Sequence, residues 1–229
     1  YKVIFLLNII MHSTVQNLIN IDGEIKYSLK KLQIQKIPKI IAVSKTFNMD
    51  KIAPLIEYGH IDFGENKVQE AVDKWTVVKE KNKNIELHMI GKLQTNKVKF
   101  AVKIFDYIHS VDSEKLAKKI ADEQLKYGKK IKVFIQVNLG NESQKSGIDK
   151  DQIKSLIAYC SQIKLSVIGL MCIPPMDLDP LPFFKQMKQL NEYFNFNELS
   201  MGMSSDYLVA TNNSATYLRI GSSIFGQRS

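Results

Sequence analysis

The sequence predicts one α/β domain, a single closed (β/α)8 TIM barrel with an extra N-terminal helix. Short apolar, β-rich runs alternate with longer segments of helical periodicity from about residue 39 onward, which is typical of parallel βαβ units. We count eight such runs with short connections, the number that closes a barrel. The length of 229 residues also matches one barrel of roughly 200 to 250 residues and leaves too little for two full domains.

The eight expected strands cover residues 39–44, 60–64, 85–91, 107–111, 132–138, 165–172, 198–202 and 217–221. Helices expected between them include residues 66–80, 113–127, 150–162 and 182–194, whose apolar side chains recur every three or four positions. Ser113 and Asp149 are suited to cap the starts of two helices, and Gly128 suits the end of one. The extra helix is expected over residues 13–32. The sequence contains neither a GxGxxG nor a GxxxxGK[ST] word, which disfavours an open nucleotide-binding sheet.

The chain begins with a largely apolar run, Val3 to Met11, which follows Lys2 and precedes a polar, helix-like segment. The run from Val3 to Met11 is too short to cross a bilayer, which takes about 20 residues. A secretory signal peptide is an alternative, but no A-x-A-like cleavage site follows the run. We therefore expect residues 1–10 to be an extra segment outside the fold, residues 11–229 to form the barrel, and the protein to be cytoplasmic without a membrane partner.

Charge and cysteine content narrow the functional classes. The 32 Lys and Arg residues outnumber the 23 Asp and Glu residues, which would suit nucleic acid, but they are scattered and interleaved with acids. We favour a solvated basic surface with no nucleic-acid partner. Cys160 and Cys172 are the only cysteines, and with no CxxC word or metal-spaced His pair they indicate neither a disulfide framework nor a metal site.

Lys45 is the first candidate for chemistry. It follows the apolar run that ends the first expected strand, and functional side chains of such barrels lie at the carboxyl ends of the strands. Desolvation at an apolar barrel mouth depresses the pKa of an amine and makes it a nucleophile toward an aldehyde. A lysine that extends its ammonium group into solvent is the alternative, and position alone does not separate the two.

The loops after the seventh and eighth strands form a candidate phosphate site. In this fold, those loops often bind phosphate through backbone N–H groups and a helix N-terminus. The candidate groups are Gly202 and Gly221, which allow close backbone approach, and the hydroxyls of Ser204, Ser205, Ser222 and Ser223. Simple helix capping by the same residues is the alternative.

Further polar residues lie in or beside the strands. Arg219, flanked by Leu218 and Ile220, should point inward, where it either forms a buried ion pair or donates to the nitrogen of a bound aromatic heterocycle. His88 and His109 are better explained as hydrogen-bonded core residues than as acid–base groups. Asn66 and Asn138, at the ends of the second and fifth strands, suit hydrogen bonding or local capping.

Five words, in order, then point to a family. They are Ala-Val-Ser-Lys-Thr at 42–46, Phe-Gly-Glu-Asn at 63–66, His-Met-Ile-Gly-Lys-Leu-Gln-Thr-Asn-Lys at 88–97, Leu-Ser-Met-Gly-Met-Ser at 199–204 and Arg-Ile-Gly-Ser at 219–222. Together the words resemble the YggS/PROSC family of pyridoxal phosphate homeostasis proteins over almost the whole chain. Asn48, where relatives often have proline, and the Pro174-Pro175 pair depart from the family pattern, and both lie in expected loops.

The resemblance implies a barrel like the N-terminal domain of alanine racemase, with pyridoxal 5′-phosphate (PLP) bound to Lys45 as a Schiff base. It also implies that Ser204, Gly221 and Ser222 hold the phosphate and that Arg219 faces the pyridine nitrogen, and we add Asn66 as a further cofactor contact. Members of the family are regarded as binding, buffering or delivering the cofactor rather than turning over a substrate. The partners implied are PLP, other B6 vitamers and PLP-dependent apoenzymes.

Three functions remain open from the residues. A carrier of PLP that affects amino-acid pools indirectly is favoured, because a racemase of this type needs a second base from an added domain and because an arginine at the ring nitrogen weakens carbanion stabilisation. A slow PLP-dependent amino-acid racemase or lyase and a phosphosugar aldolase are the alternatives. We expect a monomer, and Lys145 is either a second phosphate contact or solvated, with the solvated state favoured.

Overall fold

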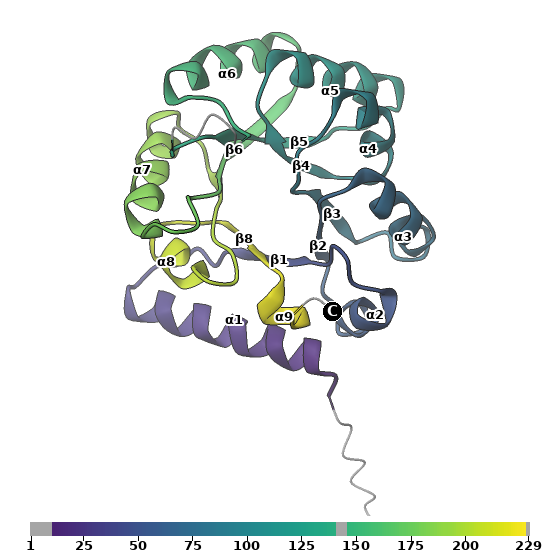
Figure 1. Cartoon of the computed structure of the whole chain (residues 1–229), viewed down its shortest axis with the longest axis vertical. Coiled ribbons are helices and arrows are strands. Elements are labelled where there is room, and N and C mark those ends of the chain that lie inside the picture. The colour runs from purple at the N-terminus through teal and green to yellow at the C-terminus, as the bar shows by residue number, and fades with distance from the viewer. Residues whose placement is uncertain (1–10, 141–145, 228–229) are drawn as a thin grey trace, which may run out of the picture.

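The computed structural model describes residues 11–140 and 146–227, and within them it forms a closed barrel of eight parallel strands, paired in sequence order with β8 returning to β1 (Figure 1). The predicted fold class is therefore confirmed. The strands are β1 Lys39–Val43, β2 Asp62–Glu65, β3 Glu86–Met89, β4 Tyr107–Val111, β5 Lys132–Val137, β6 Ser166–Cys172, β7 Glu198–Ser200 and β8 Tyr217–Ile220.

Helices surround the barrel in the connections between strands (Figure 1). They are α1 Ser13–Lys31, α2 Met49–Glu57, α3 Val68–Lys81, α4 Val98–Ile104, α5 Glu114–Lys126, α6 Ile153–Gln162, α7 Pro180–Tyr193, α8 Tyr207–Asn212 and α9 Ser222–Phe225, with short 3-10 turns η1 Thr95–Lys97 and η2 Lys150–Gln152. The predicted caps form: Ser113 Oγ accepts from the Leu116 amide at 3.3 Å, and Gly128 has the left-handed backbone (φ 60°) that ends α5.

Two hydrophobic cores divide the interior, because successive strand residues point alternately outward and inward. The larger core lies between the barrel and its helices and includes Phe63, Trp75 and Phe184. The smaller core fills the barrel and consists of Ile41, Val43, Tyr107, Phe134, Met171 and Tyr217. The barrel is thus packed, and open space for a ligand is expected at its mouths.

The extra N-terminal helix α1 completes the outer layer. It runs beside α8 and α9 (Figure 1), which are short helices of six and four residues. Asn17 Nδ2 donates to the Ile224 carbonyl at 2.9 Å, and Ser28 Oγ donates to Asn212 Oδ1 at 2.7 Å. Helix α1 therefore covers the side of the barrel that a full-length helix after β8 would otherwise cover.

The segment expected to lie outside the fold, residues 1–10, is not among the described residues. Across residues 11–140 and 146–227, the structure has no helix that is both long enough and apolar enough for a membrane span. Cys160 and Cys172 are free and buried.

Candidate functional site

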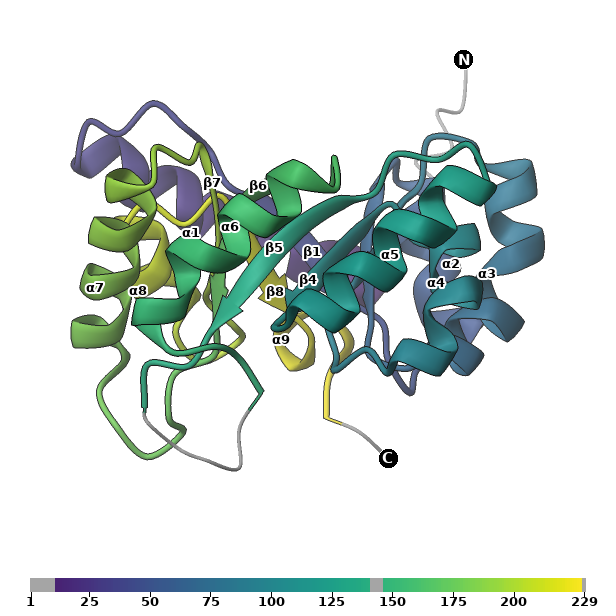
Figure 2. The ribbon, with the colours of Figure 1, turned by 90° about the horizontal axis from the view of Figure 1, so that it is seen from above.

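The predicted site residues gather at the carboxyl ends of the strands, the end at which α9 also lies (Figure 2). Lys45 is half-buried in the turn directly after β1. The register pairs Val43 with Gly64 on one side, and Ala42 with Ile220 on the other. Lys45, Asn66 and Gly221 consequently follow three neighbouring strand ends.

The turn that carries Lys45 is held on both sides by charged residues of α3. Lys74 Nζ donates to the Ser44 carbonyl at 3.0 Å, and the Thr46 amide donates to Glu70 Oε1 at 2.6 Å. Thr46 has φ 68°, a left-handed conformation that is costly for a β-branched residue. The contact with Glu70 therefore stabilises a strained backbone immediately after the lysine.

The buried carboxylate of Glu65 stabilises two of the residues in this turn contact, Ser44 and Lys74. Glu65 is fully buried at the end of β2, and its Oε1 accepts from Ser44 Oγ at 2.8 Å, Trp75 Nε1 at 2.9 Å and Lys74 Nζ at 3.0 Å. Burial acts to raise the pKa of Glu70, but the Thr46 amide and the Lys74 ammonium outweigh it and hold that pKa below its usual value. We name Ser44, Glu65, Glu70, Lys74 and Trp75 the lysine support cluster.

Sequence reasoning missed the lysine support cluster as a unit. Glu65 stands inside the Phe-Gly-Glu-Asn word, and Glu70 and Lys74 have the four-residue spacing of a helical ion pair. Nothing in the sequence, however, indicates that this pair contacts the turn after β1, since Lys74 and Ser44 are 30 positions apart.

The loops after β7 and β8 come together as predicted. Ser204 Oγ accepts hydrogen bonds from the amides of Gly221 at 3.2 Å and Ser223 at 3.3 Å, and Ser223 Oγ donates to the Ser204 carbonyl at 3.4 Å. Ser222 lies exposed between these two amides, at the first position of α9. Two backbone N–H groups thus converge on the Ser204 hydroxyl, and an anion bound here would share these donors with that hydroxyl or replace it.

Gly202 makes the close approach of these loops possible. It has φ 92°, and a Cβ atom at this position would lie 2.5 Å from the Ala210 Cβ and 3.0 Å from a Leu218 methyl group. A side chain at position 202 would therefore push the loop after β7 away from β8.

Arg219 lies inside the barrel with 4% of its surface exposed. Its Nη1 donates to Ser200 Oγ at 2.7 Å and its Nη2 donates to the Cys172 carbonyl at 2.8 Å. Both of these partners are neutral, unlike the buried ion pair considered as an alternative. Burial lowers the pKa of Arg219, and the opposing effects come from Cys172 and Asp206. Burial likewise raises the pKa of the Cys172 thiol to about 12, which keeps that thiol protonated.

Asn66 is half-buried and has an unsatisfied acceptor. Its Oδ1 is a buried side-chain atom with no hydrogen-bond partner among the described residues. It lines a pocket of about 310 Å³ together with Lys92, Gln94 and Lys97. A buried carbonyl oxygen without a donor is costly, which marks Asn66 as a group that a ligand could satisfy.

Other candidates lie elsewhere. His88 and His109 are fully buried in the barrel interior and hydrogen-bonded, as expected for core histidines. Lys145 lies outside the described residues. In the described part of the chain no group of three or more His, Cys, Asp and Glu side chains could hold a metal ion. A pocket of about 560 Å³ lies at the opposite end of the barrel, between α3 and α4, away from the strand ends that carry Lys45.

The residues at the strand ends fit a phosphorylated aldehyde with a ring nitrogen. They supply an amine in Lys45, converging backbone N–H groups beside Ser204, a guanidinium in Arg219 and an unsatisfied amide oxygen in Asn66. An amine can bond covalently to an aldehyde, and the amides complement an anion. This donor set suits PLP.

Comparison with known proteins agrees with this chemistry. The family model described as "Alanine racemase, N-terminal domain" matches residues 23–229. The pyridoxal phosphate homeostasis protein of Vibrio cholerae is 35% identical over 95% of this chain and 98% of its own length. That of Escherichia coli K12 is 35% identical over 82% of this chain and 85% of its own.

Solved structures give the same assignment. PipY of Synechococcus elongatus, solved with PLP bound, is 33% identical with a TM-score of 0.78, covering 89% of this chain and 99% of PipY. An alanine racemase of Clostridium difficile shares the fold at 13% identity and a TM-score of 0.71, covering 94% of this chain and 56% of the racemase. The chain belongs to the family of pyridoxal phosphate homeostasis proteins, built on the alanine racemase N-terminal domain.

Proposed function

We propose that this protein binds PLP at the carboxyl ends of β1, β2, β7 and β8 and takes part in intracellular PLP homeostasis by buffering or delivering the cofactor. The observation that supports the proposal is the turn after β1, which is held by Lys74 and Glu70 and follows a strand that pairs with β8, directly before Gly221. The names of the relatives and the PLP-bound structure of PipY support it.

Each residue has a proposed role. Lys45 holds the cofactor covalently through its ε-amino group, which is the site's amine nucleophile. Ser204, Gly221 and Ser222 hold the phosphate, with the Gly221 and Ser223 amides oriented toward the same place. Arg219 faces the ring nitrogen as a hydrogen-bond donor, and Asn66 supplies an acceptor. When bound, PLP supplies an aldehyde that condenses reversibly with amines.

We infer a carrier rather than an enzyme. Arg219 is a permanent donor and therefore disfavours protonation of the ring nitrogen, which weakens the ring as an electron sink. The relatives named above are called homeostasis proteins. The proposal includes a cytoplasmic location, a monomer, binding of other B6 vitamers and transfer of PLP to apoenzymes by exchange with an incoming amine.

The test is a titration of purified protein with PLP, followed by visible absorption and equilibrium dialysis. Wild type should retain one equivalent of PLP with a visible band, and Lys45→Ala should lose the band. A wild-type protein that retains no PLP would overturn the proposal. Rapid incorporation of solvent deuterium at the α-carbon of alanine would instead favour a racemase, and turnover of a phosphosugar without PLP would favour an aldolase.

A further inference from the structure

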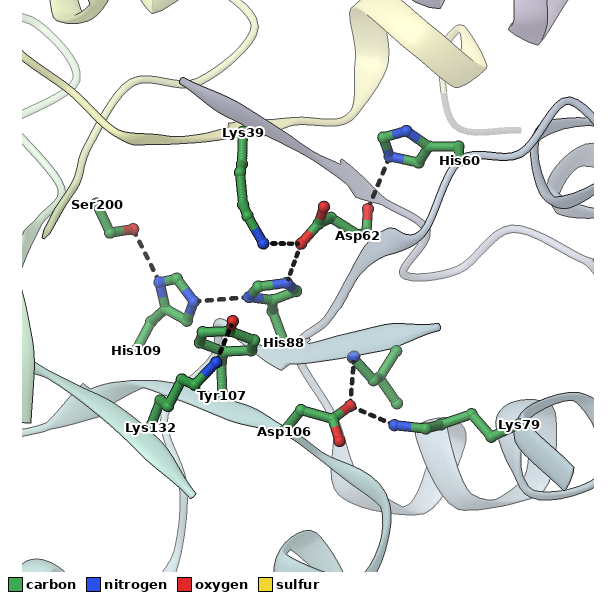
Figure 3. Close-up of polar contacts among 11 residues, drawn as sticks. Lys39, His60, Asp62, Lys79, His88, Asp106, Tyr107, His109, Lys132 and Ser200 are labelled. Atoms are coloured by element: carbon green, nitrogen blue, oxygen red, sulfur yellow. Dashed lines mark hydrogen bonds and ion pairs between the residues drawn. The ribbon is translucent and has the colours of Figure 1, made fainter. Parts of the chain in front are cut away.

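A continuous row of hydrogen-bonded side chains crosses the interior of the barrel. Figure 3 shows five of its members, contributed by five different strands, and Arg219 of β8 extends the row. In order, the members are Lys39 of β1, Asp62 of β2, His88 of β3, His109 of β4, Ser200 of β7 and Arg219 of β8.

The contacts in this row are short and buried. His88 Nε2 lies 3.1 Å from Asp62 Oδ1, His88 Nδ1 lies 3.0 Å from His109 Nε2, and His109 Nδ1 lies 2.8 Å from Ser200 Oγ. Arg219 Nη1 is 2.7 Å from the same Ser200 oxygen. The two histidines and Ser200 have no exposed surface. The row therefore exchanges no hydrogen bonds with bulk water along its middle.

The known donors and acceptors determine the direction of every bond. A guanidinium can only donate, so Ser200 Oγ accepts from Arg219 and its own hydrogen is left for His109 Nδ1. His109 Nδ1 is then an acceptor, and its proton is on Nε2, from which it donates to His88 Nδ1. Because His88 Nδ1 accepts this hydrogen bond, the proton of neutral His88 is on Nε2, from which it donates to the Asp62 carboxylate.

The opposite direction is unfavourable. In that direction His109 Nδ1 would donate to Ser200, and the Ser200 hydrogen would have no acceptor among the described contacts. His88 would also have to be cationic, or Asp62 protonated. Burial lowers the pKa of His88 and, with the His88 and Arg219 charges, lowers the pKa of His109 well below its usual value. Burial acts to raise the pKa of Asp62, but His88 and Lys39 outweigh it and hold that pKa below its usual value.

The row thus connects a cation to an anion through neutral groups. Arg219 stands at one end, and Asp62 stands at the other with Lys39 Nζ 3.5 Å from its Oδ1. Hydrogen bonds aligned in one direction polarise and strengthen one another in a low-dielectric interior. The Cys172 carbonyl accepts from the second terminal nitrogen of Arg219 at 2.8 Å, so the guanidinium is held at two points.

We propose that Asp62, His88, His109 and Ser200 form a one-directional positioning relay that sets the orientation of Arg219 and its strength as a donor to the ring nitrogen of bound PLP. This inference rests on the proposed function for the role of Arg219 and goes beyond it for the other four residues. They are positioning residues, since they act on the cofactor only through Arg219.

The first test needs no cofactor. In wild-type protein labelled with ¹⁵N-histidine, NMR should show both His88 and His109 neutral at pH 7.5, with the proton on Nε2. Ser200→Ala removes the hydrogen-bond donor to His109 Nδ1 and should shift the ¹⁵N signal of that unprotonated nitrogen, while the proton stays on Nε2. The matched control is Ser110→Ala, since Ser110 is also a buried strand serine but its hydroxyl has no partner in the described structure. A protonated Nδ1 on either wild-type histidine, or an unchanged spectrum in Ser200→Ala, would overturn the relay.

The second test uses the PLP-loaded protein. Ser200→Ala and Asp62→Asn should each shift the visible band of bound PLP and weaken its retention, by about tenfold for Ser200→Ala, or about 1.4 kcal/mol. Ser110→Ala should leave both unchanged. Asp62→Asn keeps a hydrogen-bond acceptor for His88 and removes only the negative charge. It therefore tests the polarisation of the row even if Ser200→Ala folds poorly. Bands identical to wild type in both variants would overturn the proposal. A wild type with the expected tautomers that binds no PLP would reject the proposed function and leave the hydrogen-bond row intact.

Discussion

The backbone around Lys45 is held by side chains of the neighbouring helix α3. Lys74 and Glu70 contact the residues before and after the lysine, and Glu65 supports them from beneath. Because Thr46 is strained, the turn would relax to another conformation without these contacts. We therefore propose that the lysine support cluster sets the position of Lys45.

The first prediction concerns that cluster. Lys74→Met removes the cation and leaves the Glu65 carboxylate buried, so we expect the free energy of unfolding to fall by about 3 kcal/mol. PLP retention at Lys45 should fall with it. Lys118→Met, which breaks an exposed pair with Asp122, is the control and should change stability by less than about 0.5 kcal/mol. Urea denaturation checks both variants, and equal stability of the two would contradict the proposed support.

The second prediction concerns the anion site. Ser204→Ala removes the acceptor shared by the Gly221 and Ser223 amides and should weaken PLP binding by about tenfold, because ordering of the two loops is lost along with one hydroxyl. Ser205→Ala in the same loop, at an exposed position, should stay within about twofold of wild type. Equilibrium dialysis at fixed salt measures both, and a normal affinity for Ser204→Ala would remove that residue from the site.

Among the candidate site residues, those that directly follow strands could be predicted from the sequence. Lys45, Ser204 and Gly221 were visible because they stand directly after apolar runs or in loops typical of phosphate binding. The hydrogen bond from Lys74 to the Ser44 carbonyl and the one from Arg219 to Ser200 could not be predicted from the sequence. Such contacts join different strands and helices, and single-sequence patterns carry only local spacing.

Among the elements, α1 has a larger role than its place before the barrel suggests. Its buried face, which includes Leu18, Ile21 and Ile25, packs in the outer core, and Asn17 binds the last turn of α9. Gly221 directly precedes α9, and its amide donates to Ser204 Oγ of the neighbouring loop. Helix α1 therefore supports the anion site from outside.

The third prediction tests that support. Ile25 is fully buried, so Ile25→Ala should lower the free energy of unfolding by about 3 kcal/mol through lost burial and a cavity. The control is Tyr27→Ala, two positions along α1 with 75% of its surface exposed, and it should cost less than about 0.5 kcal/mol. Thermal and urea unfolding provide the comparison. A small effect for Ile25→Ala would show that α1 is not part of the cooperative fold.

Some observed helix and strand boundaries differ from the predicted ones because of the local backbone geometry. Strand β7 ends at Ser200 rather than residue 202, because Gly202 (φ 92°) leaves strand geometry, although its carbonyl still accepts from the Arg219 amide of β8 at 2.9 Å. Strand β2 begins at Asp62 rather than residue 60, because the His60 amide still bonds the Leu55 carbonyl at the end of α2. Short helices such as α8 and α9 were not predicted, since four to six residues are too few to show helical periodicity.

Across the whole molecule, the barrel encloses charged and titratable groups as well as apolar ones. Eight apolar runs were enough to predict closure, because a parallel sheet buried on both faces has continuous apolar strands. The row from Asp62 to Arg219 could not be predicted, since five strands must meet before its members touch.

The fourth prediction is a dependence of global stability on pH. Burial lowers the pKa of His60, His88 and His109 in the folded protein, while unfolded histidines titrate near ~6.5. The unfolded chain then binds more protons as the pH falls below about 6.5. Stability should decrease toward acid by up to about 1.4 kcal/mol per pH unit for each histidine, until the folded pKa values are reached.

Asp62 adds to this loss at lower pH. Its folded pKa is depressed, so its contribution is present above its unfolded pKa of roughly 4 and is lost as the pH falls through the folded value. Urea denaturation at intervals from pH 8 to pH 3 measures the profile. A free energy of unfolding that stays constant or increases as the pH falls from 7 to 5.5 would contradict neutral, buried histidines.

Reducing the PLP-treated protein with borohydride, measuring its mass and mapping its peptides would test whether Lys45 carries the cofactor. We expect a single added pyridoxyl phosphate group per chain, located on Lys45, and none on Lys45→Ala under the same conditions. A label spread over surface lysines, or placed on a different single lysine while Lys45 stays unmodified, would contradict this expectation.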